Sequence, residues 1–314
     1  MEIEKVKTFL MGSKIDNLDI FFDYGTRNLS TFRLDGKCPL FVIANTEEAL
    51  ISLLTFLKES DTDYYFIGKG TNTLIGDCSK TVIIKLGKKF DFIEFNDGGY
   101  FTAGASCVLG KFVIKCYKNK YDFSFLAGIP GTLGGAVSGN CGNKIESICD
   151  YVESIEGLRI LKNKILKEKI KIKPFNYGYR FLKIENLAVI TRIFFKKEKS
   201  EKEIIYISIK ENIHKKKASQ PLDTFNCGCF FKNPLNSKKT AGELIDNLGL
   251  KGFVYGGAVI SIKHANFIEN NGNAAPEDIY DLSKIVAGLV YEKFKIKLEY
   301  EVKSVGFTNQ GHSR

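Results

Sequence analysis

The chain contains no tryptophan and little proline, and no part of it has the pattern of a membrane segment. Six prolines and 29 glycines in 314 residues show no collagen-like period, and 44% hydrophobic residues exclude a wholly disordered chain. No stretch approaches the roughly 18 uncharged apolar residues of a membrane helix. The segment Met1–Lys5 carries acids where a signal peptide needs basic residues followed by an apolar core. We therefore expect a soluble, cytoplasmic protein without a membrane partner.

Cysteine is also sparse and forms no metal-binding pattern. Eight cysteines in 314 residues are too few for a disulfide scaffold, and no C-x-x-C motif occurs. The one close pair, Cys227 and Cys229, has neither a second pair nor a neighbouring histidine to complete a zinc site. We expect reduced thiols and no bound metal.

Basic residues outnumber acidic ones, 46 to 36, which gives a net charge of +10. Such an excess is typical of proteins with an anionic partner: a nucleic acid, a membrane surface or a phosphorylated small molecule. It also follows from general composition, because lysine is abundant and scattered along the whole chain. The second interpretation is favoured for the excess as a whole.

The pattern of polar and apolar residues predicts an α+β protein of about two domains. Strands are predicted over Tyr64–Ile67, Thr81–Leu86, Phe90–Phe95, Tyr100–Ala103, Tyr151–Leu161, Lys164–Lys171 and Leu187–Phe195. Helices are predicted after Thr46, over Ser106–Lys118 and Ile204–Lys217, from the Thr240 capping box to Gly249, and from Pro276 onward. A last strand, Lys297–Val305, is expected to close the second domain. The charged segment 196–202 marks the boundary between the two domains.

Two glycine-rich segments stand out in the first domain. Gly68–Asn72 reads Gly-Lys-Gly-Thr-Asn and follows a predicted strand, but it matches neither the dinucleotide fingerprint nor the Walker loop. Ala127–Gly142 is too apolar for a flexible linker and too poor in side chains for a packed core. Glycine lets backbone N–H groups approach an anion closely. Either segment alone is compatible with a tight turn, whereas the two together favour an extended diphosphate ligand such as a dinucleotide.

Three further clusters hold reactive or charged side chains. Arg180 stands among tyrosines, where it either makes a surface cation–π contact or clamps a carboxylate. Cys227 and Cys229 flank a glycine before aromatic residues, and ordinary buried thiols are the simpler interpretation. Glu299 and Glu301 alternate with apolar residues, which places both on one face, and exposure to solvent is the simpler interpretation. Spacing alone does not show that these clusters meet.

Taken in order, the motifs resemble those of the UDP-N-acetylenolpyruvoylglucosamine reductase family. Gly68–Asn72 is similar to the family's first FAD loop. Phe125–Ala136 reads Phe-Leu-Ala-Gly-Ile-Pro-Gly-Thr-Leu-Gly-Gly-Ala and is similar to the second loop, a highly specific string. The other motifs follow in the family's order: Tyr177–Arg180, Gly228–Pro234, Ala241–Ile245, His264–Asn270 and Leu298–Val302. The resemblance covers roughly residues 20–306 without a break.

The resemblance implies a two-part FAD-binding domain of the vanillyl-alcohol-oxidase type followed by a smaller α+β substrate domain. We expect the FAD-binding domain at residues 1–197, with its first subdomain at about 1–78. The substrate domain is expected at 198–308 and a disordered tail at 309–314. The short distance from Arg180 to the last helix resembles the family's shorter class, which lacks an extra loop bearing a substrate-binding tyrosine.

The resemblance also implies an enzyme that reduces UDP-N-acetyl-3-O-(1-carboxyvinyl)-glucosamine to UDP-N-acetylmuramate, with FAD as cofactor and NADPH as reductant. Hydride passes from NADPH to flavin N5 and then to C3 of the substrate, so negative charge develops at C2 and in the adjacent carboxylate. Arg180 and Glu301 are expected to polarise that carboxylate, and Cys229 to protonate C2. Such an enzyme serves peptidoglycan synthesis, and with it cell wall biogenesis, cell shape and cell division.

The same resemblance names the binding residues. FAD is expected to contact Gly68, Lys69, Gly70, Thr71, Asn72, Ile129, Pro130, Gly131, Thr132, Gly134, Gly135, Ala136, Asn140 and Gly142. The substrate is expected to contact Tyr179, Lys217, Lys232 and Asn233. We expect a monomer whose partners are the UDP-sugar and NADPH, with no nucleic acid.

The chain departs from the family at three places. Cys229 stands where serine is usual; a thiol with a reference pKa of about 8.5 is a far stronger acid than an alcohol and is mostly protonated at neutral pH. Leu182 stands where a serine often follows the arginine motif, and the run Lys215–Lys217 lacks an arginine that is common there. The first change alters the proton donor, and the other two bear on substrate contacts.

Two other functions stay open at this point. The first is another flavin oxidoreductase of the same FAD-binding superfamily, which should lack the combined set of Arg180, the Cys229 motif and Glu301. The second is a basic nucleic-acid-binding protein, which should bind DNA or RNA in a salt-sensitive way. No recognition helix, zinc finger or RNA-binding motif supports the second.

Overall fold

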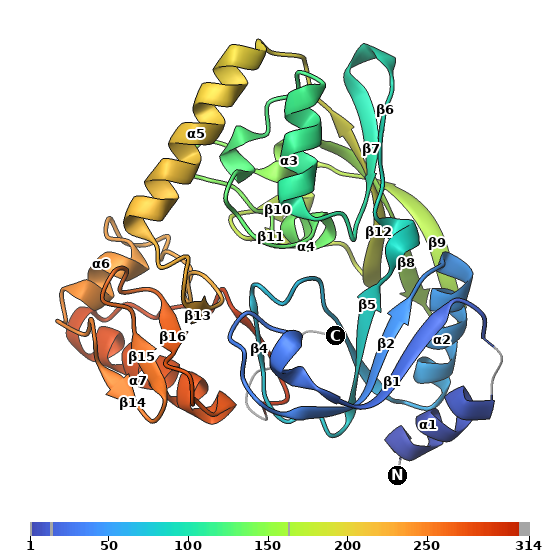
Figure 1. Ribbon diagram of the computed structural model, residues 1–314, viewed down its shortest axis with the longest axis horizontal. Helices are drawn as coiled ribbons and strands as arrows, with labels where there is room; N and C mark the ends of the chain where they lie inside the picture. Colours follow the sequence, from blue (N-terminus) through green and yellow to red (C-terminus); the bar gives the residue numbers. More distant parts are fainter. Residues whose placement is uncertain (1, 13–14, 163, 308–314) are drawn as a thin grey trace.

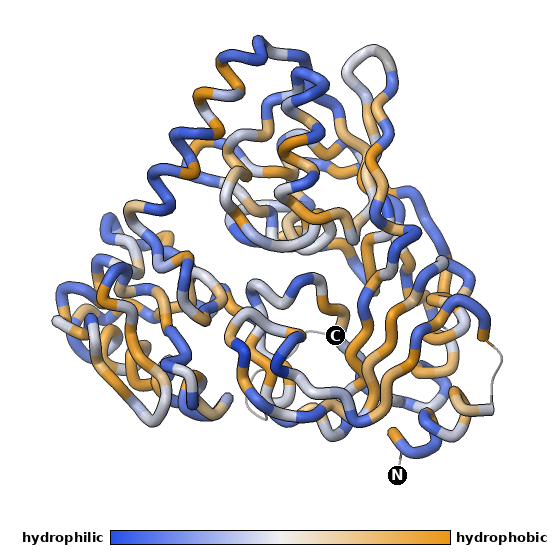
Figure 2. Tube along the Cα trace, in the orientation of Figure 1, coloured by the Kyte–Doolittle hydropathy of each residue, from blue (hydrophilic) through white to orange (hydrophobic). Residues whose placement is uncertain are grey.

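The computed structural model describes residues 2–12, 15–162 and 164–307 and shows a mixed α+β fold in three parts (Figure 1). The first and third parts lie side by side, the second lies above them in this view, and the long helix α5 (Lys202–Ser219) runs from the second to the third. Hydrophobic residues gather along the strands of the sheets (Figure 2). No helix in the described ranges combines the length and the apolar character that crossing a membrane requires.

The first part is a four-stranded sheet in the order β1-β2-β5-β3. Its strands are β1 (Leu18–Gly25), β2 (Lys37–Ala44), β3 (Asp63–Phe66) and β5 (Thr81–Leu86). β1 pairs with β2 antiparallel, and β5 pairs in parallel with β2 and β3. Because β5 belongs to this sheet, the sheet continues past the limit near residue 78 that we predicted for the first subdomain.

The helices of the first part are α1 (Glu2–Gly12) and α2 (Glu47–Glu59). The Thr46 side chain accepts a hydrogen bond from the Ala49 N–H at the start of α2, which confirms the predicted cap. The predicted apolar face of α2 is buried in one cluster with strand residues: Leu50, Leu53, Leu54 and Leu57 with Leu40, Val42, Val82 and Ile84. This packing fixes the sheet that leads into the first glycine segment.

The second part is a five-stranded antiparallel sheet in the order β6-β7-β12-β8-β9. Its strands are β6 (Ile93–Phe95), β7 (Tyr100–Gly104), β8 (Val152–Leu161), β9 (Lys164–Lys171) and β12 (Leu187–Lys196). α3 (Leu109–Lys118) and the short α4 (Leu133–Ser138) complete it. A cluster of buried aromatic rings forms its core: Phe101, Phe112, Tyr121, Phe123 and Phe195. β10 (Tyr177–Gly178) and β11 (Phe181–Leu182) form a separate two-stranded hairpin beside it.

The third part is a four-stranded antiparallel sheet with two helices. Its strands, in the order β13-β16-β15-β14, are β13 (Phe225–Asn226), β14 (Val254–Tyr255), β15 (Ala258–Ile260) and β16 (Ile268–Asn270). The predicted capping box of Thr240 and Glu243 is confirmed at the start of α6 (Ala241–Asp246). α7 (Pro276–Phe294) begins at the predicted proline and buries Ile279, Leu282, Val286 and Val290.

The last strand differs from its prediction. β17 is only Lys303–Val305, and it pairs in parallel with β4 (Thr73–Ile75), directly after the first glycine segment. The prediction of a strand over Lys297–Val305 that closes the second domain is therefore wrong in its length and in its partner. We retain residues 1–197 and 198–308 as a proposed division, which falls in the connection between β12 and α5. The predicted tail at 309–314 lies outside the described residues.

Most other predicted elements differ only at their ends. The helix predicted from Ser106 begins at Leu109, and the helix predicted over Ile204–Lys217 extends over the whole of α5. The strand predicted over Phe90–Phe95 is shortened to β6, because Lys88–Phe90 forms a turn of 3-10 helix. α1, β1 and β2 carry weak or mixed patterns, and the sequence did not predict them.

Candidate active site

The two glycine segments face each other. The Thr71 hydroxyl donates to the Pro130 carbonyl at 3.2 Å. A Cβ atom at Gly68 would lie 2.5 Å from Thr132 Oγ1, so this approach of the two segments requires glycine. Gly70 has a φ of +62°, and a side chain there would overlap the Leu29 carbonyl. The glycines are thus needed for backbone approach, as the sequence predicted.

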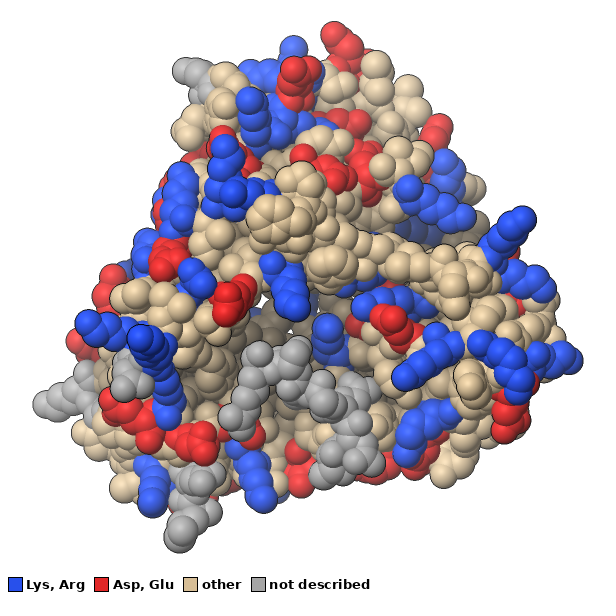
Figure 3. Space-filling view, turned by 180° about the vertical axis from the view of Figure 1, so that it is seen from behind, with Lys and Arg blue, Asp and Glu red and all other residues tan. Residues whose placement is uncertain are grey.

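A cavity of about 890 Å³ opens between these segments and the sheets of the first two parts. Its lining includes five of the predicted cofactor residues: Gly68, Lys69, Thr132, Gly134 and Gly135. The lining also includes lysines, two aspartates and apolar side chains, among them Lys85, Lys88, Lys89, Asp19, Asp91, Leu182, Ile184, Val189 and Ile190. The volume, the bare backbone and the positive charge suit an elongated ligand with phosphate groups. Seen from behind, the molecule has a hollow near its middle with basic and acidic side chains at the rim (Figure 3).

Arg180 and Glu301 form an ion pair, with 2.9 Å between Nε and Oε1. Arg180 is one of the two residues at the tip of the β10–β11 hairpin, and its Nη1 also donates to the Gly142 carbonyl at 3.1 Å. Both charged side chains are largely buried, with 24% and 21% of their surface exposed. The structure thus brings together the two residues that the family resemblance assigns to one substrate carboxylate, and that role stays a prediction.

Cys229 reaches the same place because its segment pairs with the Glu301 segment. Phe231 and Tyr300 form an antiparallel bridge, and the Glu301 N–H donates to the Phe230 carbonyl at 2.9 Å. The Asn72 side chain donates to the Glu301 carbonyl at 3.1 Å, which ties this group to the first glycine segment. The thiol, the guanidinium and the carboxyl group thus belong to one site at the end of the glycine segments.

Burial and mutual charge set the protonation of this site. Burial raises the pKa of Cys229 to about 12, helped by Glu301 and opposed by Arg180. Burial also raises the pKa of Glu301, against the opposing effect of Arg180. For Arg180, burial is the largest single effect and lowers the pKa, but Glu301 together with Cys141, Tyr179 and Cys229 outweighs it, so the guanidinium pKa is raised. The site therefore holds a protonated thiol beside a permanent cation.

Glu299, the alternative to Glu301, is exposed to solvent. Its carboxylate pairs with Lys232 at 3.4 Å, and its side chain is 74% exposed. Leu298, Tyr300 and Val302 pack in the core of the third part, as the predicted alternation requires, and residues 298–302 form only a single bridge at Tyr300 and not a regular strand.

The predicted substrate residues fall into two groups. The Asn233 N–H donates to the Tyr179 hydroxyl at 3.2 Å, and Asn233 Oδ1 accepts from the Ala241 N–H. Tyr179, Asn233 and Lys232 therefore adjoin the arginine hairpin. The side chain of Lys217 is exposed on α5, and it is its neighbour Lys216 that donates to the Ala127 carbonyl in the second glycine segment. Sequence reasoning missed Lys216, because a run of three lysines does not show which one turns inward.

Asn140 and Gly142, predicted to contact the cofactor, support the arginine hairpin in the structure. Asn140 Nδ2 donates to the Gly178 carbonyl at 2.8 Å, and Gly142 accepts from Arg180. Neither lines the cavity. Gly70, Thr71, Asn72, Ile129, Pro130, Gly131 and Ala136 are also outside its lining, and contact with the cofactor stays a prediction for the whole set.

Two further residues hold Cys229 and its neighbours, and the sequence analysis gave them no role. Asn266 is buried, its side chain accepts from the Phe231 N–H and donates to the Phe231 carbonyl, and it also hydrogen-bonds Cys229. The Cys227 thiol contacts the carbonyls of Gly70 and Thr73, both at 3.4 Å. Asn266 lies in the His264–Asn270 motif, so the motif was a signal, but its side-chain contacts depend on the fold.

Comparison with known proteins first defines the class. A family model described as an FAD binding domain matches residues 39–163, which contain both glycine segments. The cavity between those segments has the size and the bare backbone that this cofactor requires. The fold and the site define an FAD-dependent oxidoreductase, and the predicted fold class is confirmed.

A second family model, described as the C-terminal domain of UDP-N-acetylenolpyruvoylglucosamine reductase, matches residues 220–305. The chain is 34% identical over 286 residues to the enzyme of that name from Rickettsia massiliae, covering 90% of this chain and 95% of the relative. It is 31% identical over 305 residues to that from Caldanaerobacter subterraneus, covering 97% and 98%. The crystal structure of the Thermus caldophilus reductase matches with a TM-score of 0.73 and 27% identity, covering 91% and 98%. The chain belongs to the UDP-N-acetylenolpyruvoylglucosamine reductase family, whose members act in peptidoglycan precursor synthesis.

Proposed function

We propose that this chain uses NADPH to reduce UDP-N-acetyl-3-O-(1-carboxyvinyl)-glucosamine to UDP-N-acetylmuramate. The observation that carries the proposal is the Arg180–Glu301 pair, which shares one buried site with the Cys229 thiol. Asn72 joins this site to the first glycine segment. Reduction of an enolpyruvyl ether needs a hydride donor, a group that stabilises charge on the carboxylate and a proton donor, and this site offers a guanidinium for the second and a thiol for the third.

The glycine cavity is the proposed cofactor site. Its bare backbone at Gly68, Gly134 and Gly135, together with Lys69, would hold the pyrophosphate of FAD. When bound, FAD supplies the hydride acceptor and donor between NADPH and the substrate. Asn72 belongs to the first glycine segment and bonds the Glu301 carbonyl, so the proposed cofactor site adjoins the proposed reaction site. Hydride transfer therefore needs no separate carrier between the two.

The Arg180 guanidinium is proposed to bind the substrate carboxylate. As hydride adds at C3, negative charge develops at C2 and spreads into that carboxylate, where a fixed cation stabilises it most. Glu301 holds the guanidinium on one side at 2.9 Å. Burial raises the pKa of Glu301, while Arg180 opposes that rise and pairs with the carboxylate.

Cys229 is the proposed proton donor to C2. With a pKa raised to about 12, the thiol is protonated throughout the neutral range. Its proton completes the addition across the double bond, and the thiolate that remains lies near the Arg180 cation. The thiol takes the place of the serine hydroxyl that is usual in the family.

The remaining substrate contacts are proposed from where the residues lie in the structure. Tyr179, Lys232 and Asn233 adjoin the hairpin and are placed for substrate oxygens, and Lys217, at the end of α5, is proposed to reach an outer phosphate. We also propose that the enzyme acts as a cytoplasmic monomer and, through UDP-N-acetylmuramate, serves the cell wall, cell shape and cell division.

An absorbance experiment tests the function. The purified protein should show flavin bands that NADPH bleaches under anaerobic conditions. The enolpyruvyl UDP-sugar should restore them, with one equivalent of UDP-N-acetylmuramate formed. Bleaching without recovery by this substrate, and recovery by a different acceptor, would identify another flavin oxidoreductase.

A further inference from the structure

We propose that Asn140 is a positioning residue for Arg180, so that it controls substrate reduction through the guanidinium and not through the cofactor. The proposal rests on the function proposed above. It assigns Asn140, a residue that the sequence places in the cofactor loop, to the reaction end of the site. Four structural observations carry it.

The first observation is that the hairpin carrying Arg180 has little support of its own. In the described ranges β10 and β11 pair over two residues each, extended by the bond from the Lys183 N–H to the Asn176 carbonyl at 2.7 Å, and they join no other strand. A two-stranded hairpin of this kind is marginally stable in isolation. Its tip therefore needs anchors from outside.

The second observation is backbone strain at the tip. Arg180 has a φ of +62°, which is uncommon for a residue other than glycine. Such a conformation persists only where the surroundings determine it. The direction in which the Arg180 side chain leaves the hairpin thus depends on what holds the neighbouring backbone.

The third observation identifies that anchor. Asn140 Nδ2 donates to the Gly178 carbonyl at 2.8 Å, two residues before Arg180. Two residues after Asn140, the Gly142 carbonyl accepts from Arg180 Nη1 at 3.1 Å. The segment 140–142 therefore grips both the backbone and the guanidinium of the hairpin. On the opposite side, the Tyr179 hydroxyl accepts from the Asn233 N–H.

The fourth observation is that Asn140 is itself fixed. Its side chain is buried, with 4% of the residue exposed, and its Oδ1 accepts from the Cys149 N–H at 3.1 Å. Its own N–H donates to the Val137 carbonyl at the end of α4. The amide oxygen bonds the Cys149 N–H and holds Asn140 in place, whereas the amide nitrogen bonds the Gly178 carbonyl and holds the hairpin. Both polar atoms of the side chain are thus engaged by protein backbone inside the fold.

Asn140→Asp tests the proposal, because it separates the two hydrogen bonds that the Asn140 side chain makes. The carboxylate keeps the bond from the Cys149 N–H but cannot donate to Gly178, and it adds a negative charge near the guanidinium. Rapid-mixing measurements should show that substrate reoxidises the reduced flavin about 10²-fold more slowly, since a misplacement of about 1 Å can cost that much. FAD content and flavin reduction by NADPH should be unchanged.

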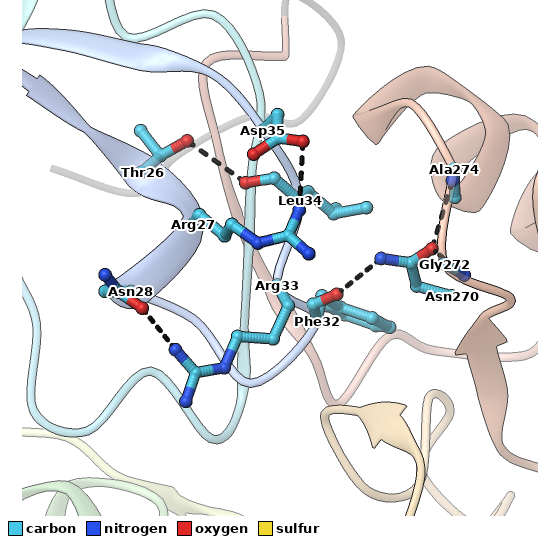
Figure 4. Close-up of polar contacts among 10 residues, drawn as sticks. All are labelled: Thr26, Arg27, Asn28, Phe32, Arg33, Leu34, Asp35, Asn270, Gly272 and Ala274. Atoms are coloured by element: carbon cyan, nitrogen blue, oxygen red, sulfur yellow. Dashed lines mark hydrogen bonds and ion pairs between the residues drawn. The ribbon is translucent and has the colours of Figure 1, made fainter.

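Asn270→Asp is the matched control. Asn270 is a buried asparagine that donates to a backbone carbonyl, that of Phe32, at 2.8 Å, and accepts from Gly272 and Ala274 (Figure 4). The same amide-to-carboxylate change there removes a comparable bond away from the hairpin. It should lower the melting temperature without a selective loss of substrate reduction. A similar selective loss in this control would overturn the proposal.

A double substitution tests whether the effect passes through Arg180. In an Arg180→Ala background, Asn140→Asp should cause little further loss, because coupled residues are not additive. Additive losses, or loss of FAD from Asn140→Asp, would overturn the proposal and return Asn140 to the cofactor. If Asn140→Asp does not fold, Asn140→Ser provides the same comparison. Failure of the wild-type protein to use the substrate would instead refute the proposed function.

Discussion

The two ends of the site are built in different ways. The cofactor end consists mainly of backbone, contributed by two segments in which glycine permits close approach, as at Gly68 against Thr132. The reaction end consists of three side chains from segments far apart in the chain: Arg180, Cys229 and Glu301. They meet only through bonds between those segments, such as that from the Glu301 N–H to Phe230.

This difference predicts two kinds of mutational effect. Changes at the reaction end should impair one half-reaction and leave the cofactor in place. Changes at the cofactor end should impair binding of FAD and stability, with little effect on the chemistry of the molecules that remain loaded. The following experiments test that distinction.

The largest effect is expected for Cys229→Ala. Loss of the proton donor should slow substrate reduction by about 10²- to 10⁴-fold, the usual contribution of a general acid. Flavin reduction by NADPH should be retained. Cys229→Ser, which restores a hydroxyl, should keep measurable turnover. Stopped-flow absorbance separates the two half-reactions, and full substrate turnover by the alanine variant would remove residue 229 from the mechanism.

Glu301→Gln should have the next largest effect. It removes the charge that holds Arg180 at 2.9 Å and should slow substrate reduction by about 10²- to 10³-fold, as for loss of one preorganised group. The control is Glu299→Gln, which alters an exposed pair with Lys232 and should change the rate little. Equal losses in both half-reactions would show that Glu301 is structural.

Gly70→Ala tests the cofactor end. A left-handed alanine at φ +62° that also overlaps the Leu29 carbonyl should lower stability by at least about 1–3 kcal/mol. FAD occupancy should fall with it, whereas loaded molecules should reduce substrate at the normal rate. The control is Gly110→Ala in α3, where a Cβ meets nothing within 4 Å and alanine favours the helix. Thermal melting curves and the flavin content per chain, measured for both variants, test this prediction.

The smallest effect is expected from pH: we predict that the rate of substrate reduction is not lost at mildly alkaline pH. In the proposed mechanism the protonated thiol of Cys229 is the active form, and its pKa is raised to about 12, so we expect activity to be lost only as pH rises toward that value. An ordinary thiol, with a pKa of about 8.5, would already be more than half ionised at about pH 9. Substrate reduction by the wild type and by Cys229→Ser should therefore have the same profile from neutral pH to about pH 9. A fall in the wild type alone would mean that the thiol is more acidic than its burial implies.

The cofactor end was largely predictable from the sequence, because glycine patterns are local. Helices with clear caps were predictable for the same reason, as at Thr46, Thr240 and Pro276. Arg180, Cys229 and Glu301 were named through family resemblance, and spacing alone did not show that they meet. The positions of Asn140 and of Lys216 were not predictable, because they depend on which side chain the tertiary fold turns inward.

The parallel pairing of β17 with β4 has a consequence for biosynthesis. Asn72, in the first glycine segment, bonds Glu301, which is made 229 residues later, and the Lys303 N–H donates to the Asn72 carbonyl. The nascent chain therefore cannot form these bonds of the first glycine segment until residue 303 has been made. A polypeptide truncated before residue 301 would lack both the Glu301 carboxylate and these bonds to Asn72, and we expect such products to bind little FAD.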